Sequence, residues 1–313
     1  MATKAKLNVM FSFHNYSGNG GIGCIHPSIA EWWGRTLVKM KTDDRVGEIM
    51  TISPADTPIT MVRNGAVRDA KASGADVLVM IDSDQWPDLY LDKDPLAKPF
   101  WDSSFNFLYD RWCRGLATVI GAPYCGPSPD QVVYVFKWNN HHTPTDVRGV
   151  AKITDQPDMK IEMFSRNEAA QAQGIAPAAA LPTGLIMFDM RAFEPLPHPY
   201  FYYEWTDETQ SEKASTEDVT ATRDISLIHQ IKYGYSPVYV NWDAWAGHMK
   251  PQCVGKPVLL TVDQVGDKYK KCLADNVRSD ERVVHVGVDG GFNRLNIMGG
   301  DGKPVRIPAN GAV

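Results

Sequence analysis

The sequence lacks the features that mark zinc-binding, disulfide-stabilised and membrane-spanning proteins. Its five cysteines are odd in number, lie far apart and form no CxxC pair, so a zinc site of the usual spacing is not expected. No stretch reaches the roughly 20 apolar residues of a membrane helix. The first apolar run, at residues 7–13, is too short for a signal peptide. We therefore expect a soluble, cytoplasmic chain whose thiols stay reduced.

The chain also lacks a strong excess of charge of either sign. Its formal net charge is −5, which gives no indication of a nucleic-acid or acidic-membrane partner. The distribution is uneven, because residues 1–249 hold 22 Lys and Arg against 30 Asp and Glu, whereas residues 250–313 hold 10 against 7. A length of 313 residues suits one large α/β domain with a small appendage. We place the domain at residues 1–255 and a β-rich extension at 256–313.

What the sequence does contain is an alternation of strand and helix patterns. The first 81 residues predict strands at 7–13, 45–53 and 76–81, separated by helices at 27–41 and 59–73. This β-α-β-α-β order predicts a parallel sheet with helices on its faces. Later segments add helices at 101–113, 168–173 and 217–233 and strands at 117–122, 132–136, 185–188 and 237–240.

The strand at residues 77–81 ends in the most informative pattern, Asp82-Ser83-Asp84. Carboxylates at i and i+2 leave the same face of an extended chain, so both can reach one divalent cation or its water. In open α/β sheets, ligands bind at such strand ends. The pattern therefore predicts a metal-dependent enzyme that acts on a phosphate-bearing substrate.

Four pieces follow one another along the chain: Asp82-Ser-Asp84, the Thr183-Gly184 turn before a buried strand, Glu217-Asp218 at a helix start, and His248 in a later loop. This order resembles the GT-A glycosyltransferases, whose shared motifs are DxD, a glycine loop, xED and a C-terminal histidine. The helical pair Arg63-Asn64 before the DxD strand is similar to that of family-2-like members. The resemblance covers residues 7–250 and implies a Rossmann-like, mostly parallel sheet flanked by helices.

The resemblance implies a donor site for a nucleotide-sugar, most simply a UDP-sugar, and a Mn²⁺ or Mg²⁺ cofactor. Asp84 would coordinate the cation, Asp82 would contact the ribose or a metal-bound water, and His248 would complete the metal shell or contact the diphosphate. Arg63 would lie near the diphosphate or orient a DxD carboxylate. The remaining residues expected at the donor are Asn64, Asp56, Thr183, Gly184 and Lys250.

The resemblance also implies catalytic roles for the acids of the xED motif, Glu217 and Asp218. An acceptor hydroxyl is a poor nucleophile at neutral pH, and a carboxylate within hydrogen-bonding distance can remove its proton as the new bond forms. Asp218 is therefore expected to be the general base of an inverting transfer. In a retaining transfer it would position the acceptor instead.

Each motif taken alone has a plainer interpretation. Glu217 and Asp218 are typical helix-start acids favoured by the helix dipole, and His248 could be an ordinary hydrogen-bonded loop histidine. Arg63 could be a surface ion-pair residue. Trp242 and Trp245 could stack on a sugar or base, but core packing is the commoner use of tryptophan.

Three rival functions stay open. A haloacid-dehalogenase-type phosphatase also has DxD after an apolar strand, but it requires Thr or Val where Trp86 stands. A sugar-1-phosphate nucleotidyltransferase requires GxGxRxxP, and no Arg and Pro follow Gly18–Gly23 at that spacing. The non-enzyme alternative is a carbohydrate- or nucleic-acid-binding protein on an inactive GT-A scaffold.

The acceptor and the oligomeric state are left open by the sequence. Polysaccharide, small metabolite, protein and modified DNA base are all candidate acceptors. A specific hypothesis is a phage- or bacterial-type enzyme whose basic extension contacts hydroxymethylated DNA, through Lys268, Lys270, Lys271, Arg278, Arg282, Arg294 and Arg306. The favoured interpretation of these residues is plainer: solvated charges balanced by nearby acids.

Overall fold

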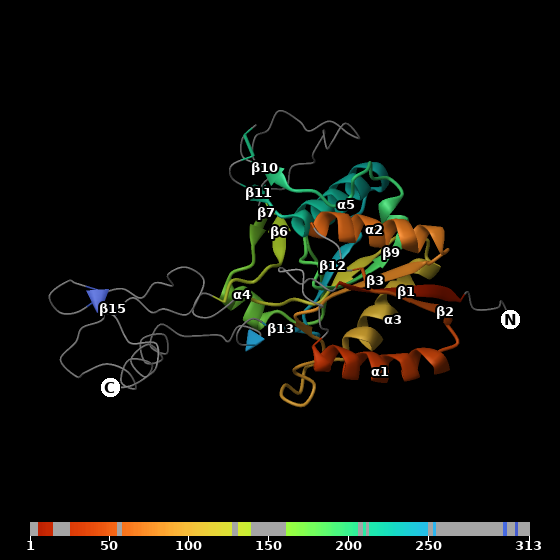
Figure 1. The fold of residues 1–313 in the computed structure, drawn as a ribbon, viewed down its shortest axis with the longest axis horizontal. Helices are drawn as coiled ribbons and strands as arrows, with labels where there is room; N and C mark the ends of the chain where they lie inside the picture. The colour runs from red at the N-terminus through yellow and green to blue at the C-terminus, as the bar shows by residue number, and fades with distance from the viewer. Residues whose placement is uncertain are drawn as a thin grey trace.

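The computed structural model describes residues 6–14, 26–54, 58–126, 131–138, 161–205, 209–210, 213–249, 253–254, 297–298 and 304–305. Its centre is a seven-stranded sheet of order β2-β1-β3-β9-β5-β12-β8 with helices on both faces (Figure 1). The expected mixed α/β fold with a mostly parallel sheet is confirmed.

Five strands of the central sheet run parallel: β1 (Leu7–His14), β2 (Val46–Ile52), β3 (Val77–Asp82), β5 (Val119–Gly121) and β12 (Val238–Asn241). The edge strand β8 (Ile175–Pro177) is antiparallel to β12. In the middle, β9 (Leu185–Asp189) lies between β3 and β5 and runs antiparallel to both. The start of β9 therefore lies at the edge of the sheet where its neighbours end.

The helices form two layers around this sheet. Figure 1 shows α2 (Ile59–Ala72) and α5 (Glu217–Tyr233) on one face, and α1 (Pro27–Thr42) and α3 (Phe100–Cys113) on the other. Two short helical pieces are α4 (Arg166–Gln171) and the 3₁₀ turn η1 (Met190–Phe193). A small three-stranded sheet contains β4 (Gln85–Trp86), β13 (Gly247–Met249) and β14 (Cys253–Val254). Three two-stranded ladders pair β10 (Glu204–Trp205) with β11 (Lys213–Ser215), β6 (Phe136–Trp138) with β7 (Ile161–Met163), and β15 (Ile297–Met298) with β16 (Pro304–Val305).

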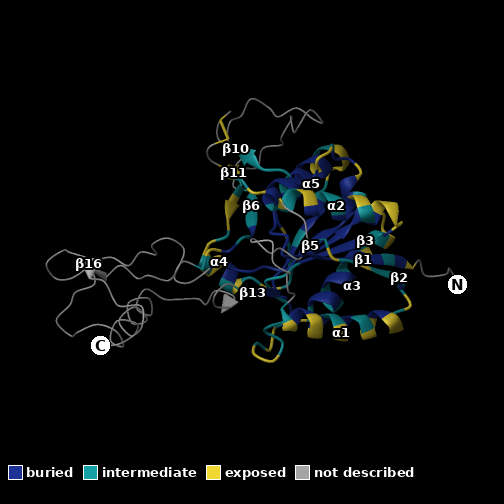
Figure 2. Cartoon of the chain, viewed as in Figure 1, coloured by how far each residue is buried: buried dark blue, intermediate teal, exposed yellow. Residues whose placement is uncertain are grey.

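The hydrophobic core is divided in two by the sheet. Along β1, Val9 and Phe11 pack toward α1 and α3, whereas Met10 packs toward α2 and α5, as the two-residue period of a strand requires. The central strands are buried on both faces (Figure 2). Burying a large apolar side chain contributes about 1.5–3 kcal/mol, so these two clusters hold the sheet edge that carries the site.

The helix ends follow the signals in the sequence. Pro27 is the first residue of α1, where its missing N–H is not needed. Thr216 is the N-cap residue of α5, with Glu217 and Asp218 in the first turn, and Gly234 ends that helix with φ +77. The Thr216 hydroxyl does not cap the helix backbone; it donates to Asp218 Oδ1 at 2.5 Å.

Some predicted elements differ from those observed. The strand expected at 132–136 consists of an isolated bridge between Val133 and Cys125 followed by β6. The helix expected at 168–173 begins earlier, at Arg166, because Ser165 and Glu168 form a capping box. Apart from β15 and β16, the proposed extension at 256–313 lies outside the described residues. The division into two domains therefore stays a prediction.

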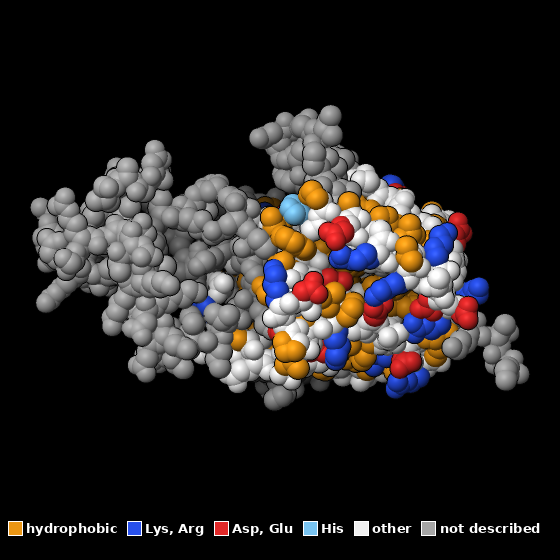
Figure 3. All heavy atoms as spheres, turned by 90° about the horizontal axis from the view of Figure 1, so that it is seen from below, with side chains coloured by type: hydrophobic (Ala, Val, Ile, Leu, Met, Phe, Trp, Pro, Cys, Tyr) orange, Lys and Arg blue, Asp and Glu red, His pale blue; other side chains and the backbone are white. Residues whose placement is uncertain are grey.

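The described surface mixes its charges. On the face seen in Figure 3, Lys and Arg side chains alternate with Asp and Glu and form no large patch of one sign. Ion pairs on helices α1 and α3 contribute to this pattern, such as Arg35 with Glu31 and Lys39 with Asp102. A search of the helices in the described ranges finds none with the length and apolar character needed to cross a bilayer.

Candidate functional site

Four segments meet at one edge of the central sheet. His14 ends β1 and lies opposite Asp82, the last residue of β3, in the parallel register. The amide of Asp82 donates to the carbonyl of Gly184 at 2.8 Å, just before β9 begins. Tyr124 follows β5 nearby and packs its ring 4.8 Å from that of His248. The fold thus gathers the DxD strand end, the Thr183-Gly184 turn and the late histidine at one place.

Arg63 is the buried centre of the site. It lies on the first turns of α2 with 4% of its surface exposed, and it donates to both oxygens of Asp82 at 2.9 and 3.3 Å. Its other terminal nitrogen donates to Glu217 at the start of α5. Burial lowers the pKa of Arg63, but Asp82, Asp218 and Glu217 more than offset this and leave it raised. Arg63 is therefore a permanent cation that joins the DxD strand to the xED helix.

Asp82 is held in its charged form by two partners. Burial raises the pKa of its carboxyl, yet Arg63 and a hydrogen bond from His14 outweigh burial and lower it overall. Burial lowers the pKa of His14, so this ring is neutral. His14 Nδ1 donates to Asp82 Oδ1 at 3.2 Å. This leaves His14 Nε2 as a buried lone pair with no hydrogen-bond partner in the described part of the chain.

The second aspartate has a different environment. Strand β13 pairs with β4, and the amide of Met249 donates to the carbonyl of Asp84 at 2.6 Å. This brings His248 Nε2 to 3.2 Å from Asp84 Oδ2, while His248 Nδ1 donates to the carbonyl of Cys125 at 3.1 Å. In a neutral His248 the Nε2 lone pair would face a carboxylate oxygen, a pairing that requires a proton or a cation between the two atoms.

The two acids at the start of α5 have different contacts. Glu217 is buried against Arg63; burial raises the pKa of its carboxyl and Arg63 lowers it, with a net rise. Asp218 is partly exposed, and its Oδ1 accepts from the Thr216 hydroxyl and from the amide of Val219 at 2.9 Å. Within the described ranges, these hydrogen bonds are both made to Oδ1 of Asp218 and none is recorded to its Oδ2.

The turn before β9 is closely packed. A Cβ added to Gly184 would lie 2.6 Å from Gln85 Nε2 and 2.8 Å from the Tyr124 ring, so only glycine fits there. Thr183 is fully buried, and its hydroxyl has no hydrogen-bond partner among the residues described. The prediction that Gly184 permits a close approach is consistent with this packing, although the observed neighbours are side chains of the site itself.

The remaining predicted residues fall into two groups. Asn64 lies beside the site, but its amide is fully used: it donates to the carbonyls of Thr60 and Phe201 and accepts from the amides of Tyr200 and Phe201. A donor contact by Asn64 thus stays a prediction that would require breaking one of these bonds. Asp56 and Lys250 lie outside the described residues.

An open cleft of about 650 Å³ lies over this edge. Its lining residues come from β1, α2, β3 and the segment before β10, namely His14, Pro58, Ile59, Arg63, Asp82, Ser83, Asp84 and Tyr203. The sequence analysis did not assign roles to His14 or Tyr203. His14 could have been found, because it ends the strand expected beside the DxD strand; nothing in the sequence around Tyr203 indicates its place.

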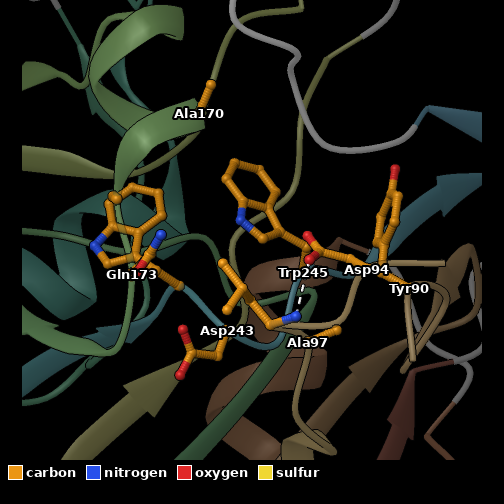
Figure 4. A pocket seen from close by; sticks show the side chains of 10 residues that line it. Tyr90, Asp94, Ala97, Ala170, Gln173, Asp243 and Trp245 are labelled. Atoms are coloured by element: carbon orange, nitrogen blue, oxygen red, sulfur yellow. Dashed lines mark hydrogen bonds between the residues drawn. The ribbon is translucent and has the colours of Figure 1, made fainter. Parts of the chain in front are cut away.

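Trp242 and Trp245 lie elsewhere. Each is 3% exposed and packs in the core cluster on the α2 and α5 face, so the core-packing interpretation is confirmed. They also border a separate pocket of about 50 Å³ with Tyr90 and Asp243 (Figure 4). Asp243 accepts there from the amide of Gly174 at 2.6 Å and from Lys98 Nζ at 2.7 Å. This pocket has room for water-sized groups only.

No group of three or more His, Cys, Asp or Glu side chains that could hold a metal ion exists among the described residues. A divalent cation at Asp84 and His248 would therefore need additional oxygen ligands from water or substrate. Mg²⁺ is commonly bound in this way, through one or two carboxylates together with substrate phosphates. The residues present fit such a shared site.

Compared with known protein families and with curated proteins, the chain matches none. Among solved structures it is similar to A197 from STIV, with 13% identity, a TM-score of 0.43, and 82% of this chain and 97% of that chain covered. A second similar structure is a putative glucose-1-phosphate thymidylyltransferase from Bacillus anthracis in complex with sucrose, with 10% identity, a TM-score of 0.37, and coverage of 77% and 89%.

A third similar structure is HddC from Yersinia pseudotuberculosis complexed with GMP-PN, with 11% identity, a TM-score of 0.28, and coverage of 86% and 99%. Two of these three are thus described by a nucleotidyltransferase activity or a bound nucleotide analogue. At these scores the likeness carries no argument about activity, which has to be argued from the residues of the cleft.

Proposed function

We propose that the chain is a metal-dependent glycosyltransferase that moves a sugar from a nucleoside-diphosphate sugar, most simply a UDP-sugar, to an acceptor hydroxyl. The observation that carries the proposal is that Asp82 and Asp84 line one cleft, with His248 3.2 Å from Asp84 and with Arg63 joining Asp82 to Glu217, the residue before Asp218. The GT-A resemblance of these motifs, noted from the sequence, supports the same function.

The cation would be Mn²⁺ or Mg²⁺, held by Asp84 and His248, with Asp82 reaching it through water. A bound cation neutralises charge that develops on a departing diphosphate. The protein supports this by fixing the ligands: the Cys125 carbonyl orients His248, and the backbone bond from Met249 holds Asp84 beside it. Arg63 contacts Asp82 directly, which agrees with the second of its two expected roles, the orientation of a DxD carboxylate.

Asp218 is the proposed general base of an inverting transfer. Its free carboxylate oxygen takes the proton of the acceptor hydroxyl as that oxygen bonds to the sugar C1. The bond from C1 to the diphosphate oxygen breaks, and its electron pair leaves with the nucleoside diphosphate. Glu217 does not share this task in the proposal, because its side chain is buried and committed to Arg63.

The rival functions would place different requirements on Asp82 and Asp218. A phosphatase that uses this aspartate as a nucleophile would have to free it from both Arg63 and His14. An inactive binding protein would have no need of the unshared oxygen on Asp218. Both rivals are outcomes of the experiment that follows.

The test is a thermal-shift screen of UDP, GDP, CDP and TDP, each with and without Mn²⁺. A ligand that binds only the folded state raises the apparent stability, by about 2.7 kcal/mol at one hundred times its dissociation constant. We expect a shift with UDP that requires Mn²⁺ and disappears in Asp84→Asn. The matched control is Asp92→Asn, which removes an exposed carboxylate outside the cleft. The absence of a metal-dependent shift with all four nucleotides would contradict the proposal.

A further inference from the structure

A second groove of about 650 Å³ adjoins the cleft, and of its lining residues only Asn64 was predicted from the sequence to belong to a site. One wall is the first turn of α2, with Thr60 and Met61, and the other is the segment from His198 to Trp205. Tyr203 lines both this groove and the cleft, so the two are continuous. Figure 1 places β10, which contains Trp205, on the same side of the sheet as α2 and α5.

The lining of the groove is aromatic and uncharged. Tyr202, Tyr203 and Trp205 are partly exposed there, and no Asp, Glu, Lys or Arg belongs to the described lining. Met61 adds an apolar side chain that is 57% exposed, which is unusual for methionine. Two cations contact the aromatic residues from outside the lining: Arg223 donates to the Tyr202 hydroxyl at 3.4 Å, and the Lys213 ammonium lies 4.0 Å from the centroid of the Tyr203 ring. Flat apolar faces with few hydrogen-bonding groups suit a neutral ligand with C–H surfaces.

The groove is held in shape before any ligand arrives. Asn64 fixes the backbone of Tyr200 and Phe201 with three hydrogen bonds and makes a fourth to the Thr60 carbonyl. The Tyr202 hydroxyl donates to Asp224 at 2.9 Å, and the Thr220 hydroxyl donates to the Tyr202 carbonyl at 2.6 Å. These bonds attach the aromatic wall to both α2 and α5. A wall fixed in this way loses little conformational entropy on binding.

The groove also leads toward the proposed base. A hydrogen bond to Glu217 and burial, the larger effect, both raise the pKa of the Tyr203 hydroxyl, so Tyr203 stays neutral beside the start of α5. Asp218 is the next residue of that helix. The aromatic wall therefore ends at the start of α5, where the charge of Asp218 is among the causes that raise the pKa of Tyr203.

We propose that this groove binds the acceptor of the transfer and that the acceptor is a neutral carbohydrate, with a sugar ring stacked on Trp205. The inference rests on the proposed function, which it deepens by naming the acceptor class. A sugar ring offers C–H faces to aromatic side chains and hydroxyl groups to the base. A polyanion such as DNA would instead require cationic side chains along its path, which the described lining does not contain.

The experiment measures acceptor binding without any donor present. Saturation-transfer NMR is recorded with neutral gluco-, galacto-, manno- and N-acetylglucosamine oligosaccharides, and with hydroxymethylated duplex DNA as the polyanion. The variants are Trp205→Ala and Met61→Glu. Met61 is the third residue of α2, where an acidic side chain is favoured by the helix dipole, so that variant is expected to fold. The matched control is Val38→Glu, which also adds an acid at an exposed apolar position, on α1.

We expect contacts to at least one neutral oligosaccharide, with binding weakened by on the order of tenfold in both groove variants and unchanged in Val38→Glu. No contact with any neutral oligosaccharide, or contacts that survive in both groove variants, would overturn the inference. Binding of DNA alone that the groove variants reduce would overturn it in favour of a polyanionic acceptor.

The nucleotide screen keeps this inference separate from the proposed function. Both groove variants are expected to retain the metal-dependent UDP shift of the wild type. If the wild type shows no nucleotide shift but its oligosaccharide contacts depend on Trp205 and Met61, the transferase proposal fails and the groove stands as a carbohydrate site. If the UDP shift is present and the oligosaccharide contacts are not, only the acceptor inference fails.

Discussion

The two sides of the cleft differ in how completely their charges are matched. On the Arg63 side, Asp82 and Glu217 share a buried guanidinium, and His14 adds a hydrogen bond. On the His248 side, Asp84 faces a histidine nitrogen at 3.2 Å with its side chain 33% exposed. On the first side two carboxylates are paired with the guanidinium, although Arg63 Nε and His14 Nε2 have no hydrogen-bond partner among the described residues. On the second side, a neutral His248 requires a proton or cation between its Nε2 and Asp84. One DxD motif thus combines a residue that holds the site together with a residue that meets the ligand.

The largest expected effect comes from removing Arg63, the buried cation that joins the two acidic motifs. Arg63→Met would remove the cation beside the buried Glu217 and leave Asp82 with its hydrogen bond from His14, which costs about 3–5 kcal/mol of unfolding free energy. Arg68→Met is the control on the same helix, because the Arg68 side chain is 76% exposed and forms a surface ion pair with its neighbour Asp69. Urea unfolding of both variants makes the measurement. Equal stabilities would show that the Arg63 network does not hold the two motifs together.

The next effect concerns catalysis at the edge of that network. Asp218→Asn preserves the shape of the side chain but removes the proposed base, so turnover should fall by about 10²-fold or more. The metal-dependent nucleotide shift should remain, because Asp218 does not belong to the proposed cation site. The rate of nucleoside diphosphate release gives the readout, with Asp92→Asn as the control. Undiminished release in Asp218→Asn would remove this residue from the mechanism.

A smaller effect tests how tightly the two sides are packed together. Gly184→Ala places a Cβ against Gln85 and Tyr124, and overpacking of this kind costs about 1–3 kcal/mol. Gly65→Ala is the control: a Cβ added there would lie 4.0 Å from the Arg68 side chain, and alanine in a helix is favoured by about 0.5–1 kcal/mol. Opposite signs in thermal or urea unfolding are expected. A Gly184→Ala protein as stable as the wild type would mean that the turn is loosely packed.

The smallest effect uses a histidine outside the cleft as a reference for His14. His229 is 2% exposed, its Nε2 donates to the Ala192 carbonyl, and burial lowers its pKa to about 4. Above about pH 6.5 the ring is neutral in both the folded and the unfolded chain, so its full contribution to the free energy of unfolding is present. As the pH falls from there toward 4, only the unfolded chain takes up the proton, so stability drops by about 1.4 kcal/mol per pH unit.

His229→Gln should remove that part of the acid sensitivity. Unfolding free energies measured at pH 7, 6 and 5 give the slope, and the exposed His198→Gln variant serves as the control. For His14 the loss has the same direction, because burial lowers its pKa and outweighs the hydrogen bond with Asp82 that raises it. An unchanged slope in His229→Gln would mean that this ring already ionises in the folded protein.

Sequence patterns predicted the frame of this site well and its contacts poorly. The apolar run before Asp82 and the N-cap of α5 are local signals, and both motifs lie where those signals place them. The direction of β9 could not be predicted, because a strand buried on both faces has the same apolar pattern in either orientation. Asp82 and Glu217 lie 19 and 154 residues from Arg63 along the sequence, and no local pattern encodes contacts over such separations. The place of Tyr203 in the cleft could not be predicted for the same reason.

The reversed strand β9 has a consequence for how the molecule can vary. Between β5 and β9 the chain passes through the edge strand β8, and both ends of that path are joined by a 2.9 Å hydrogen bond between the Ala122 amide and the Leu185 carbonyl. Everything inserted between these two points starts and finishes beside the cleft. Because loop length costs little once the ends are fixed, this path can lengthen or shorten without disturbing the strand order. Changes in the path between β5 and β9 can therefore alter which ligands fit the cleft without altering the charged network around Arg63.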